Sequence, residues 1–157
     1  MPGREDYILK FIALLREAIA QMVKFREKGR YTDALDVALR VQEKLFGRTT
    51  AELAALSLDE LIRLLRVDET PAGGDEKVLG YSALLRETGL VYLEMSRVTA
   101  AESCFQLALH VALTVAVAQP SPTPEVLAQV RDLLAHVPAD QLHAPVQEML
   151  AALGNRA

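Results

Sequence analysis

Tryptophan is absent from this chain, cysteine occurs once, and all aromatic residues together make up only 5% of the 157 residues. The single cysteine, Cys104, excludes an intramolecular disulfide and a zinc site built from several cysteines. A Gly-x-Ser-x-Gly motif is also missing, and Gly73-Gly74 is not followed by the Lys-Ser/Thr pair of a phosphate-binding loop. We therefore predict that the chain is not an enzyme and holds no cofactor.

Metal-binding spacings are missing as well. The three histidines, His110, His136 and His143, belong to no His-x-x-x-His or Glu-x-x-His pair that would place two ligands on one helical face. We expect His110 to be a hydrogen-bonded core or interface residue, His136 to lie at a helix C-terminus, where positive charge is favourable, and His143 to lie on the surface. The sequence predicts no metal site.

No apolar run is long enough for a typical membrane span. The longest, residues 107–118, has twelve residues and includes His110 and Thr114, whereas a spanning helix needs about 20. The opening Arg4-Glu5-Asp6 does not resemble the basic start of a secretory signal. These features predict a soluble protein of the cytoplasm.

The net charge of −4 is unevenly distributed. Residues 1–48 carry ten Lys and Arg against seven Asp and Glu, whereas residues 49–157 carry seven against fourteen. The densest basic cluster, Lys24 to Arg30, contains Glu27 and fits the solvated last turn of a helix. Nucleic-acid binding would need a basic face with aromatic or glycine residues between the charges, so it is a weaker alternative.

Alanine and leucine dominate, and apolar residues recur at steps of three and four, which predicts helices and no strand. We expect one all-α domain, 1–157, of about seven to eight helices. Its predicted parts are a first helix pair at 5–47, two short helices at 49–66, a loop at 67–77, a second pair at 75–118 and a C-terminal pair at 123–154. Pro138 is expected to open the last helix, with Pro145 kinking it or marking its true start.

Residues 111–118 are apolar on all sides of a predicted helix. Such a helix must be buried all round, either by the C-terminal helix pair or by a second subunit. This surplus of apolar surface predicts self-association as a homodimer through this helix and the first one.

Two stretches 67 residues apart are alike, around Ala34 and Ala101. The second resembles a tetratricopeptide (TPR) motif, because small and aromatic residues fall at the family's packing positions. The residues that carry the resemblance are Tyr31, Ala34 and Ala38 in the first stretch, and Gly89, Tyr92, Ala101, Phe105 and Ala108 in the second. The first stretch departs from the pattern at Met22, where the family has a small residue. The resemblance implies helix pairs stacked as a right-handed superhelix, with a compact helical bundle as the alternative.

TPR proteins bind peptides in the groove lined by the first helix of each pair. The positions that match the family's clamp residues hold Val23 and Glu27 in the first helix, and Leu90 and Glu94 in the second. The candidate groove also includes Arg16, Ile19, Arg86 and Leu93. The asparagines of a carboxylate clamp are missing, so the resemblance implies an apolar groove with acidic edges that suits a helix or a second copy.

The segment Glu5-Asp6-Tyr7-Ile8-Leu9, together with Gly29-Arg30-Tyr31 and the leucine-rich residues 56–65, is also similar to a family of short bacterial proteins of unknown function. The predicted function is a protein–protein interaction or scaffold module that binds a protein, a peptide or itself. The alternative is a bundle that binds a small apolar or peptide ligand.

Overall fold

A computed structural model describes residues 4–154, with side chains from Tyr7 onward, so the predictions for the side chains of Glu5 and Asp6 lie outside it. Eight α-helices and one short 3₁₀ helix follow one another, and no β-strand occurs between residues 4 and 154. They are α1 (Arg4–Glu27), α2 (Tyr31–Phe46), α3 (Thr50–Ala54), α4 (Leu58–Arg66), α5 (Pro71–Glu94), α6 (Val98–Ala118), α7 (Pro124–Leu134), η1 (Ala139–Gln141) and α8 (Ala144–Gly154). The all-α prediction is confirmed.

Local signals set the helix ends in the first half of the chain. Gly29 and Gly47 adopt φ of +73° and +63°, a conformation that glycine reaches without steric cost. Thr49 forms a full capping box with Glu52, and the Ser57 hydroxyl accepts a hydrogen bond from the Glu60 amide. The two short helices predicted at 49–66 are therefore present.

The loop predicted at 67–77 is wrong over most of its length, because α5 begins at Pro71 and includes the two glycines. The Thr70 hydroxyl caps the helix by accepting from the Gly73 amide, and Pro71 occupies the first turn, where it loses no hydrogen bond. Gly73 and Gly74 are buried. A Cβ on Gly73 would lie 2.5 Å from Ile8 of α1, and one on Gly74 would lie 3.1 Å from the Arg66 guanidinium. These glycines are therefore packing sites.

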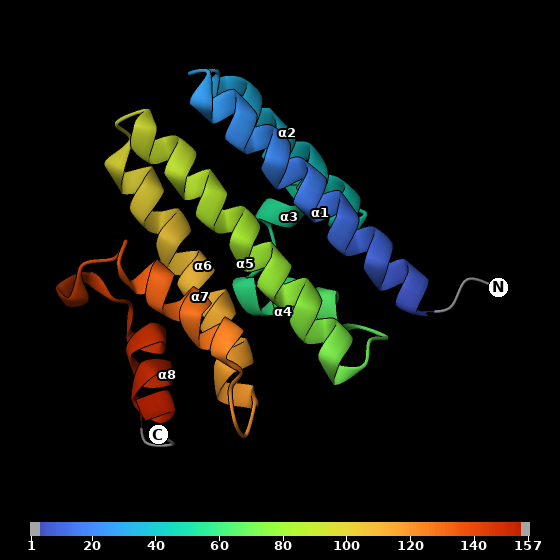
Figure 1. The fold of residues 1–157 in the computed structure, drawn as a ribbon, viewed down its shortest axis with the longest axis vertical. Coiled ribbons are helices and arrows are strands. Elements are labelled where there is room, and N and C mark those ends of the chain that lie inside the picture. Colours follow the sequence, from blue (N-terminus) through green and yellow to red (C-terminus); the bar gives the residue numbers. More distant parts are fainter. Residues whose placement is uncertain (1–3, 155–157) are drawn as a thin grey trace.

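Helix pairs α1–α2 and α5–α6 lie side by side, and α7 and α8 flank α6 (Figure 1). Ile8 of α1 lies against Gly73 of α5, Leu15 lies against Gly80, and Arg26 binds Glu87. Since these contacts follow the same order in both helices, α1 and α5 run parallel. Gly89 lies against Phe105 and Ser82 bonds to the carbonyl of Ala108, so α5 and α6 are antiparallel.

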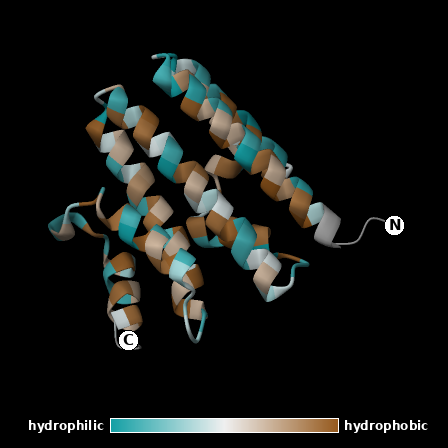
Figure 2. Cartoon of the chain, in the orientation of Figure 1, coloured by the Kyte–Doolittle hydropathy of each residue, from teal (hydrophilic) through white to brown (hydrophobic). Residues whose placement is uncertain are grey.

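Helix α6 contributes more buried apolar residues than any other described helix, and its ribbon lies beside that of α5 (Figure 2). By length and composition alone it could cross a membrane, but 56% of its most apolar stretch is buried inside the molecule, as expected of a core helix. Helices α5, α7 and α8 all pack against it, and Val111, Leu113 and Val115 are fully buried. Most of the apolar residues at 111–118 that suggested a second subunit are therefore buried within the chain itself, although Ala118 is exposed.

The C-terminal segment differs in detail from the expectation. Pro138 precedes the short η1 turn instead of opening the last helix, and Pro145 is the second residue of α8, so it marks the true start of that helix. Buried Gln106 of α6 attaches the connecting segment by donating to the carbonyl of Gln141 and accepting from the amide of His143. These two bonds position α8 against α6.

Candidate functional site

The structure places the predicted groove residues on two parallel helices, four on α1 and four on α5. Ile19, Val23, Arg86 and Leu90 are half-buried, whereas Arg16, Glu27, Leu93 and Glu94 are exposed. Ile19 and Leu90 pack against the core. The two sets thus lie on neighbouring helices, but part of each set is used for internal packing.

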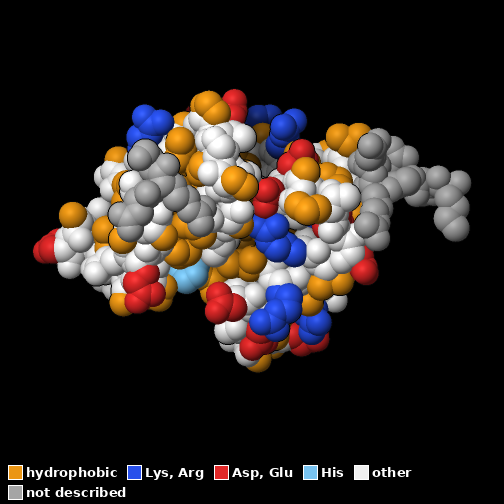
Figure 3. All heavy atoms as spheres, turned by 90° about the horizontal axis from the view of Figure 1, so that it is seen from below, with side chains coloured by type: hydrophobic (Ala, Val, Ile, Leu, Met, Phe, Trp, Pro, Cys, Tyr) orange, Lys and Arg blue, Asp and Glu red, His pale blue; other side chains and the backbone are white. Residues whose placement is uncertain are grey.

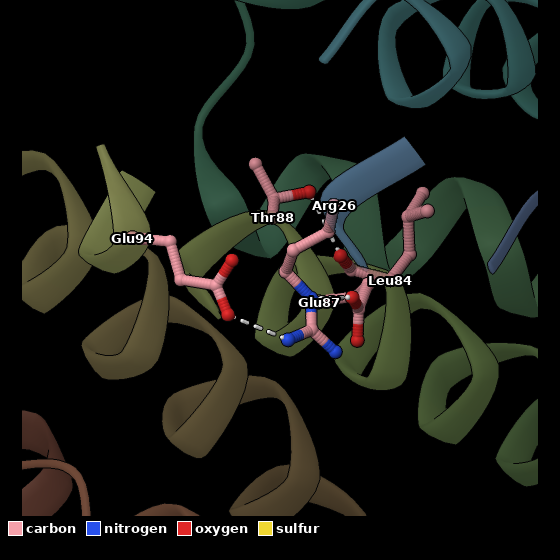
Figure 4. A network of polar contacts seen from close by, with 5 residues as sticks. All are labelled: Arg26, Leu84, Glu87, Thr88 and Glu94. Atoms are coloured by element: carbon pink, nitrogen blue, oxygen red, sulfur yellow. Dashed lines mark hydrogen bonds and ion pairs between the residues drawn. The ribbon is translucent and has the colours of Figure 1, made fainter. Parts of the chain in front are cut away.

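An ion-pair network crosses from α1 to α5 at this position (Figure 4). Arg26 donates from Nε to Oε1 of Glu87 at 2.7 Å and from Nη1 to Oε1 of Glu94 at 2.9 Å. Desolvation opposes the charge of Arg26, but hydrogen bonds to Glu87 and Glu94 outweigh it, so the pKa of Arg26 is raised. The Glu94 carboxylate, which was predicted to give the groove an acidic edge, is therefore paired with the Arg26 guanidinium.

Arg86 is engaged by the C-terminal half of the molecule. Its Nε and Nη2 atoms both donate to the carboxylate of Asp132 on α7, and Gln129 of α7 donates to the carbonyl of Leu79 at 3.1 Å. Helix α7 is thereby tied to α5. The Arg86 guanidinium is therefore already paired with a carboxylate of the same chain.

The residues predicted to pack the repeats lie where helices meet. A Cβ on Gly89 would come within 2.8 Å of the Phe105 ring. Ala34, Ala38, Gly89, Ala101, Phe105 and Ala108 are buried, and Tyr31 and Tyr92 are half-buried. The Phe105 ring also stacks on His136 at 4.5 Å, so the role of His136 beyond the end of α7 is aromatic packing.

The described residues contain no cluster with metal-binding geometry. Among them, no three His, Cys, Asp or Glu side chains lie close enough together to hold a metal ion. His110 is half-buried, whereas His143 is exposed. Desolvation lowers the pKa of His110, with opposing influence from Asp59 and a further lowering by His143.

The lowered pKa of His110 predicts a pH dependence of stability. Just below the ordinary histidine pKa of about 6.5, the unfolded chain binds more protons at His110 than the folded chain does. The free energy of unfolding therefore increases with pH in this range and reaches its full value above the ordinary pKa. It should fall as pH drops through the pKa of folded His110. Urea unfolding between pH 7.5 and 5.5 should show this decline, and a His110→Gln variant should flatten it. Equal slopes in the two proteins would contradict the prediction.

Cys104 is predicted to be a poorly reactive thiol. Burial raises the pKa of Cys104 to about 11, so very little thiolate exists at neutral pH. Alkylation by iodoacetamide at pH 7.5 should be more than tenfold slower than in the urea-unfolded chain. A folded-state rate matching that of the unfolded chain would disprove the burial of this side chain.

The concave surfaces lie elsewhere, on the face where α1 meets α2. One cavity of about 260 Å³ and one of about 180 Å³ follow each other along these helices and share Leu14 and Lys44. We call them together the α1–α2 groove. Its lining residues are Tyr7, Lys10, Phe11, Leu14, Glu17, Ala18, Gln21, Val37, Arg40, Val41, Lys44 and Leu45. None of the eight predicted groove residues is among them.

The larger cavity, about 490 Å³, continues from the end of this groove, with which it shares Tyr7, Phe11 and Leu45. We call it the junction cavity because α1, α2, α4 and α5 meet there. It is lined by Tyr7, Phe11, Leu45, Phe46, Arg48, Leu64, Leu65, Val67, Asp68, Glu69 and Lys77. The lower face of the molecule, by contrast, shows Lys, Arg, Asp and Glu interspersed with apolar side chains (Figure 3).

A buried ion pair forms part of the junction cavity. Lys77 Nζ lies 3.0 Å from Oε1 of Glu69, and the two side chains are only 6% and 5% exposed. The ammonium group also lies 4.8 Å from the ring centre of Tyr7 and 4.7 Å from that of Phe11, within cation–π range. Glu69 Oε2 is buried without a hydrogen-bond partner. This is the polar cluster in the described structure whose hydrogen bonding is least complete.

Glu69 and Lys77 both fall in the segment 67–77 that the composition predicts to be a surface loop, so this cluster was not expected from the sequence. A signal was available, since Thr70-Pro71 is a strong helix start that would have extended α5 over Lys77. Nothing in the spacing, however, would have paired Tyr7 with a lysine 70 positions later. No protein-family model, curated protein sequence or solved structure matches this chain.

Proposed function

We propose that this chain is a non-catalytic helical scaffold that binds an acidic amphipathic segment of a partner protein in the α1–α2 groove. The observation that carries the proposal is the continuous concave strip between α1 and α2, with an apolar floor and cations at its edge. Helix-in-groove recognition uses such a surface, with apolar anchors at i, i+3, i+4 and i+7.

The dimensions of the groove suit a short helix. The lining residues of α1 extend from Tyr7 to Gln21, which at 1.5 Å per residue corresponds to about 21 Å. A partner helix of about 14 residues has that length. Leu14, Ala18 and Val41 contribute to the apolar lining that its anchors would contact.

Charge favours an acidic partner. Lys10 and Lys44 line the groove and form no salt bridge within the described part of the chain, and Arg40 binds only the exposed Asp36 of its own helix. Glu17 is the one acid among the lining residues. Although the protein as a whole has a net charge of −4, these cations form a locally basic strip that is complementary to a partner's Asp and Glu.

The TPR-like stacking is part of the same proposal. Parallel α1 and α5, each followed by an antiparallel partner, and the close approach of Gly89 to Phe105 support it. Self-association stays a prediction, and it has lost one of its arguments because α6 is covered within the chain. Light scattering that gives the 17.2 kDa mass of one chain would contradict a stable dimer.

The test is a selection from a library of 14-residue peptides, followed by fluorescence anisotropy of the peptides selected. We expect acidic sequences with apolar residues at helical spacing, and at least tenfold weaker binding by a Lys10→Glu, Lys44→Glu variant. The matched control is Lys24→Glu, Lys28→Glu, which changes two exposed lysines outside the groove and should lose much less affinity.

Salt provides a second readout, because exposed charge pairs weaken as ionic strength rises. Affinity should fall between 50 and 300 mM salt for the wild type and much less for the groove variant. Selection of basic or charge-independent peptides would contradict the proposal, as would equal affinity in both lysine variants. Preferential binding of a DNA or RNA duplex would support the nucleic-acid alternative instead.

A further inference from the structure

The junction cavity has features that a peptide groove does not require. Its volume of about 490 Å³ lies within the range of about 300–1,000 Å³ that is usual for small-ligand sites. Phe11, Phe46, Leu64 and Leu65 supply apolar walls from three helices. Ligand sites combine such walls with a few placed polar groups, and this cavity has four charged residues.

The Lys77–Glu69 pair is energetically unfavourable compared with apolar side chains in the same space. Burying both charges carries a desolvation cost that an apolar pair of similar volume would avoid. The hydrogen-bonding capacity of the pair is also unfilled: among the described residues, Glu69 Oε2 accepts no hydrogen bond, and Lys77 Nζ donates to Glu69 Oε1 alone. Buried polar groups are normally satisfied, so this pair has one acceptor and further N–H donors left for a ligand.

The remaining two charged residues add one more group of each sign. Arg48 lies just beyond α2 and forms no salt bridge with any described residue. Asp68 is exposed and adopts φ of +60°, a left-handed conformation that aspartate tolerates better than most residues. The cavity therefore presents two cations and two carboxylates around an apolar interior.

We propose that the junction cavity binds a small zwitterion with an apolar body, namely an apolar α-amino acid or a dipeptide of such residues. Its carboxylate binds Lys77 and Arg48, its ammonium group binds Glu69 and Asp68, and its side chain lies against the apolar walls. Glu69 Oε2 reaches the ammonium group by rotation about the terminal torsion of Glu69, which is a soft coordinate. This proposal is independent of peptide binding in the α1–α2 groove.

Other ligand classes satisfy the cavity less well. A fatty carboxylate would pair with the cations but would leave Glu69 Oε2 without a donor and would face two carboxylates. An apolar amine would pair with the acids and leave Arg48 and the free N–H groups of Lys77 without an acceptor. An uncharged apolar molecule would leave all four charged groups without a hydrogen-bonding or charged partner.

The test is calorimetric titration of the whole chain with leucine, phenylalanine and leucyl-leucine. N-acetyl-leucine lacks the ammonium group, leucinamide lacks the carboxylate, and glycine lacks the apolar body. We expect the three zwitterions to bind and each of the three altered compounds to bind at least tenfold more weakly. Failure of all three zwitterions to bind at 10 mM would overturn the proposal, as would equal binding of N-acetyl-leucine or decanoate.

Variants locate the site. Arg48→Gln changes an exposed residue and should weaken binding at least fivefold, and Leu64→Trp should abolish binding by filling the cavity. Arg63→Gln, an exposed change on α4 outside the cavity, is the matched control and should bind normally. Because Lys77→Met alone would leave a buried charge, the paired variant Lys77→Met, Glu69→Leu is used, and it should fold and lose binding.

The Lys10→Glu, Lys44→Glu variant separates this site from the α1–α2 groove, because it should retain amino-acid binding even if peptide binding is lost. Amino-acid binding that survives both Arg48→Gln and Leu64→Trp would place the ligand elsewhere and overturn the proposal.

Discussion

Replacing Arg26 with methionine is expected to lower the free energy of unfolding by about 3 kcal/mol, because it leaves a buried carboxylate without a counter-charge. The side chain of Glu87 is only 5% exposed, and Arg26 is its partner across the contact between α1 and α5. The value lies at the low end of the range for broken buried pairs, since the Arg26 side chain is itself 20% exposed. Urea unfolding followed by circular dichroism gives the measurement.

Two further variants test the cause of this loss. The double variant Arg26→Met, Glu87→Met removes the buried charge of Glu87 together with its partner and should recover most of the lost stability, because the carboxylate left without Arg26, that of Glu94, is 41% exposed to water. Arg40→Met breaks the exposed pair with Asp36, whose side chains are 75% and 51% exposed, and should cost well under 1 kcal/mol. Similar losses in Arg26→Met and Arg40→Met would show that the Arg26 network is not a buried one.

Gly89→Ala is expected to destabilise the protein by about 1–2 kcal/mol, although alanine is the better helix former by about 1 kcal/mol. The new Cβ would lie 2.8 Å from Cε1 of Phe105 and 3.0 Å from two further ring atoms. Phe105 is 2% exposed and stacked on His136, so its ring has little freedom to move aside. The overpacking cost should therefore exceed the gain in helix propensity, and thermal or urea unfolding would measure the difference.

Gly80→Ala is the matched control on the same helix. Its Cβ would lie 2.6 Å from Cδ1 of Leu15, which is the mobile end of a flexible side chain. Leu15 is as buried as Phe105, at 2% exposed, but its terminal methyl group can shift by a small side-chain rotation, so the loss should be smaller than in Gly89→Ala. A more stable Gly89→Ala protein would mean that α5 and α6 do not approach each other as closely as described.

Features governed by neighbouring residues could be predicted from the sequence. The turns at Gly29 and Gly47, the capping box of Thr49 and Glu52, and the proline start of α7 each depend on a few adjacent residues. Helical periodicity likewise reports local burial, which is why the all-α fold was predicted. The physical reason is that capping and backbone preference act within one or two turns of helix.

Predictions from local sequence were wrong where packing between helices stabilised a different structure. Pro71, Gly73 and Gly74 predict a loop by composition, but Thr70 caps a helix there and Ile8 and Arg66 contact the faces of the two glycines. Glycine weakens an isolated helix by about 1 kcal/mol, and close packing against another element can offset that cost. The start of α5 is therefore set by the local Thr70-Pro71 signal together with packing against residues of other helices.

The candidate sites show the same division. Sequence alone determined that the chain is helical, which faces of its helices are apolar, and that small residues occur where helices can approach closely. Only the tertiary structure brought Arg26 to Glu87, Arg86 to Asp132, and Lys77 to the rings of α1. Periodicity describes one helix at a time, whereas these contacts join residues at least 46 positions apart. Which charges meet depends on how whole helices pack, so the cavities and their chemistry exist only in the folded chain.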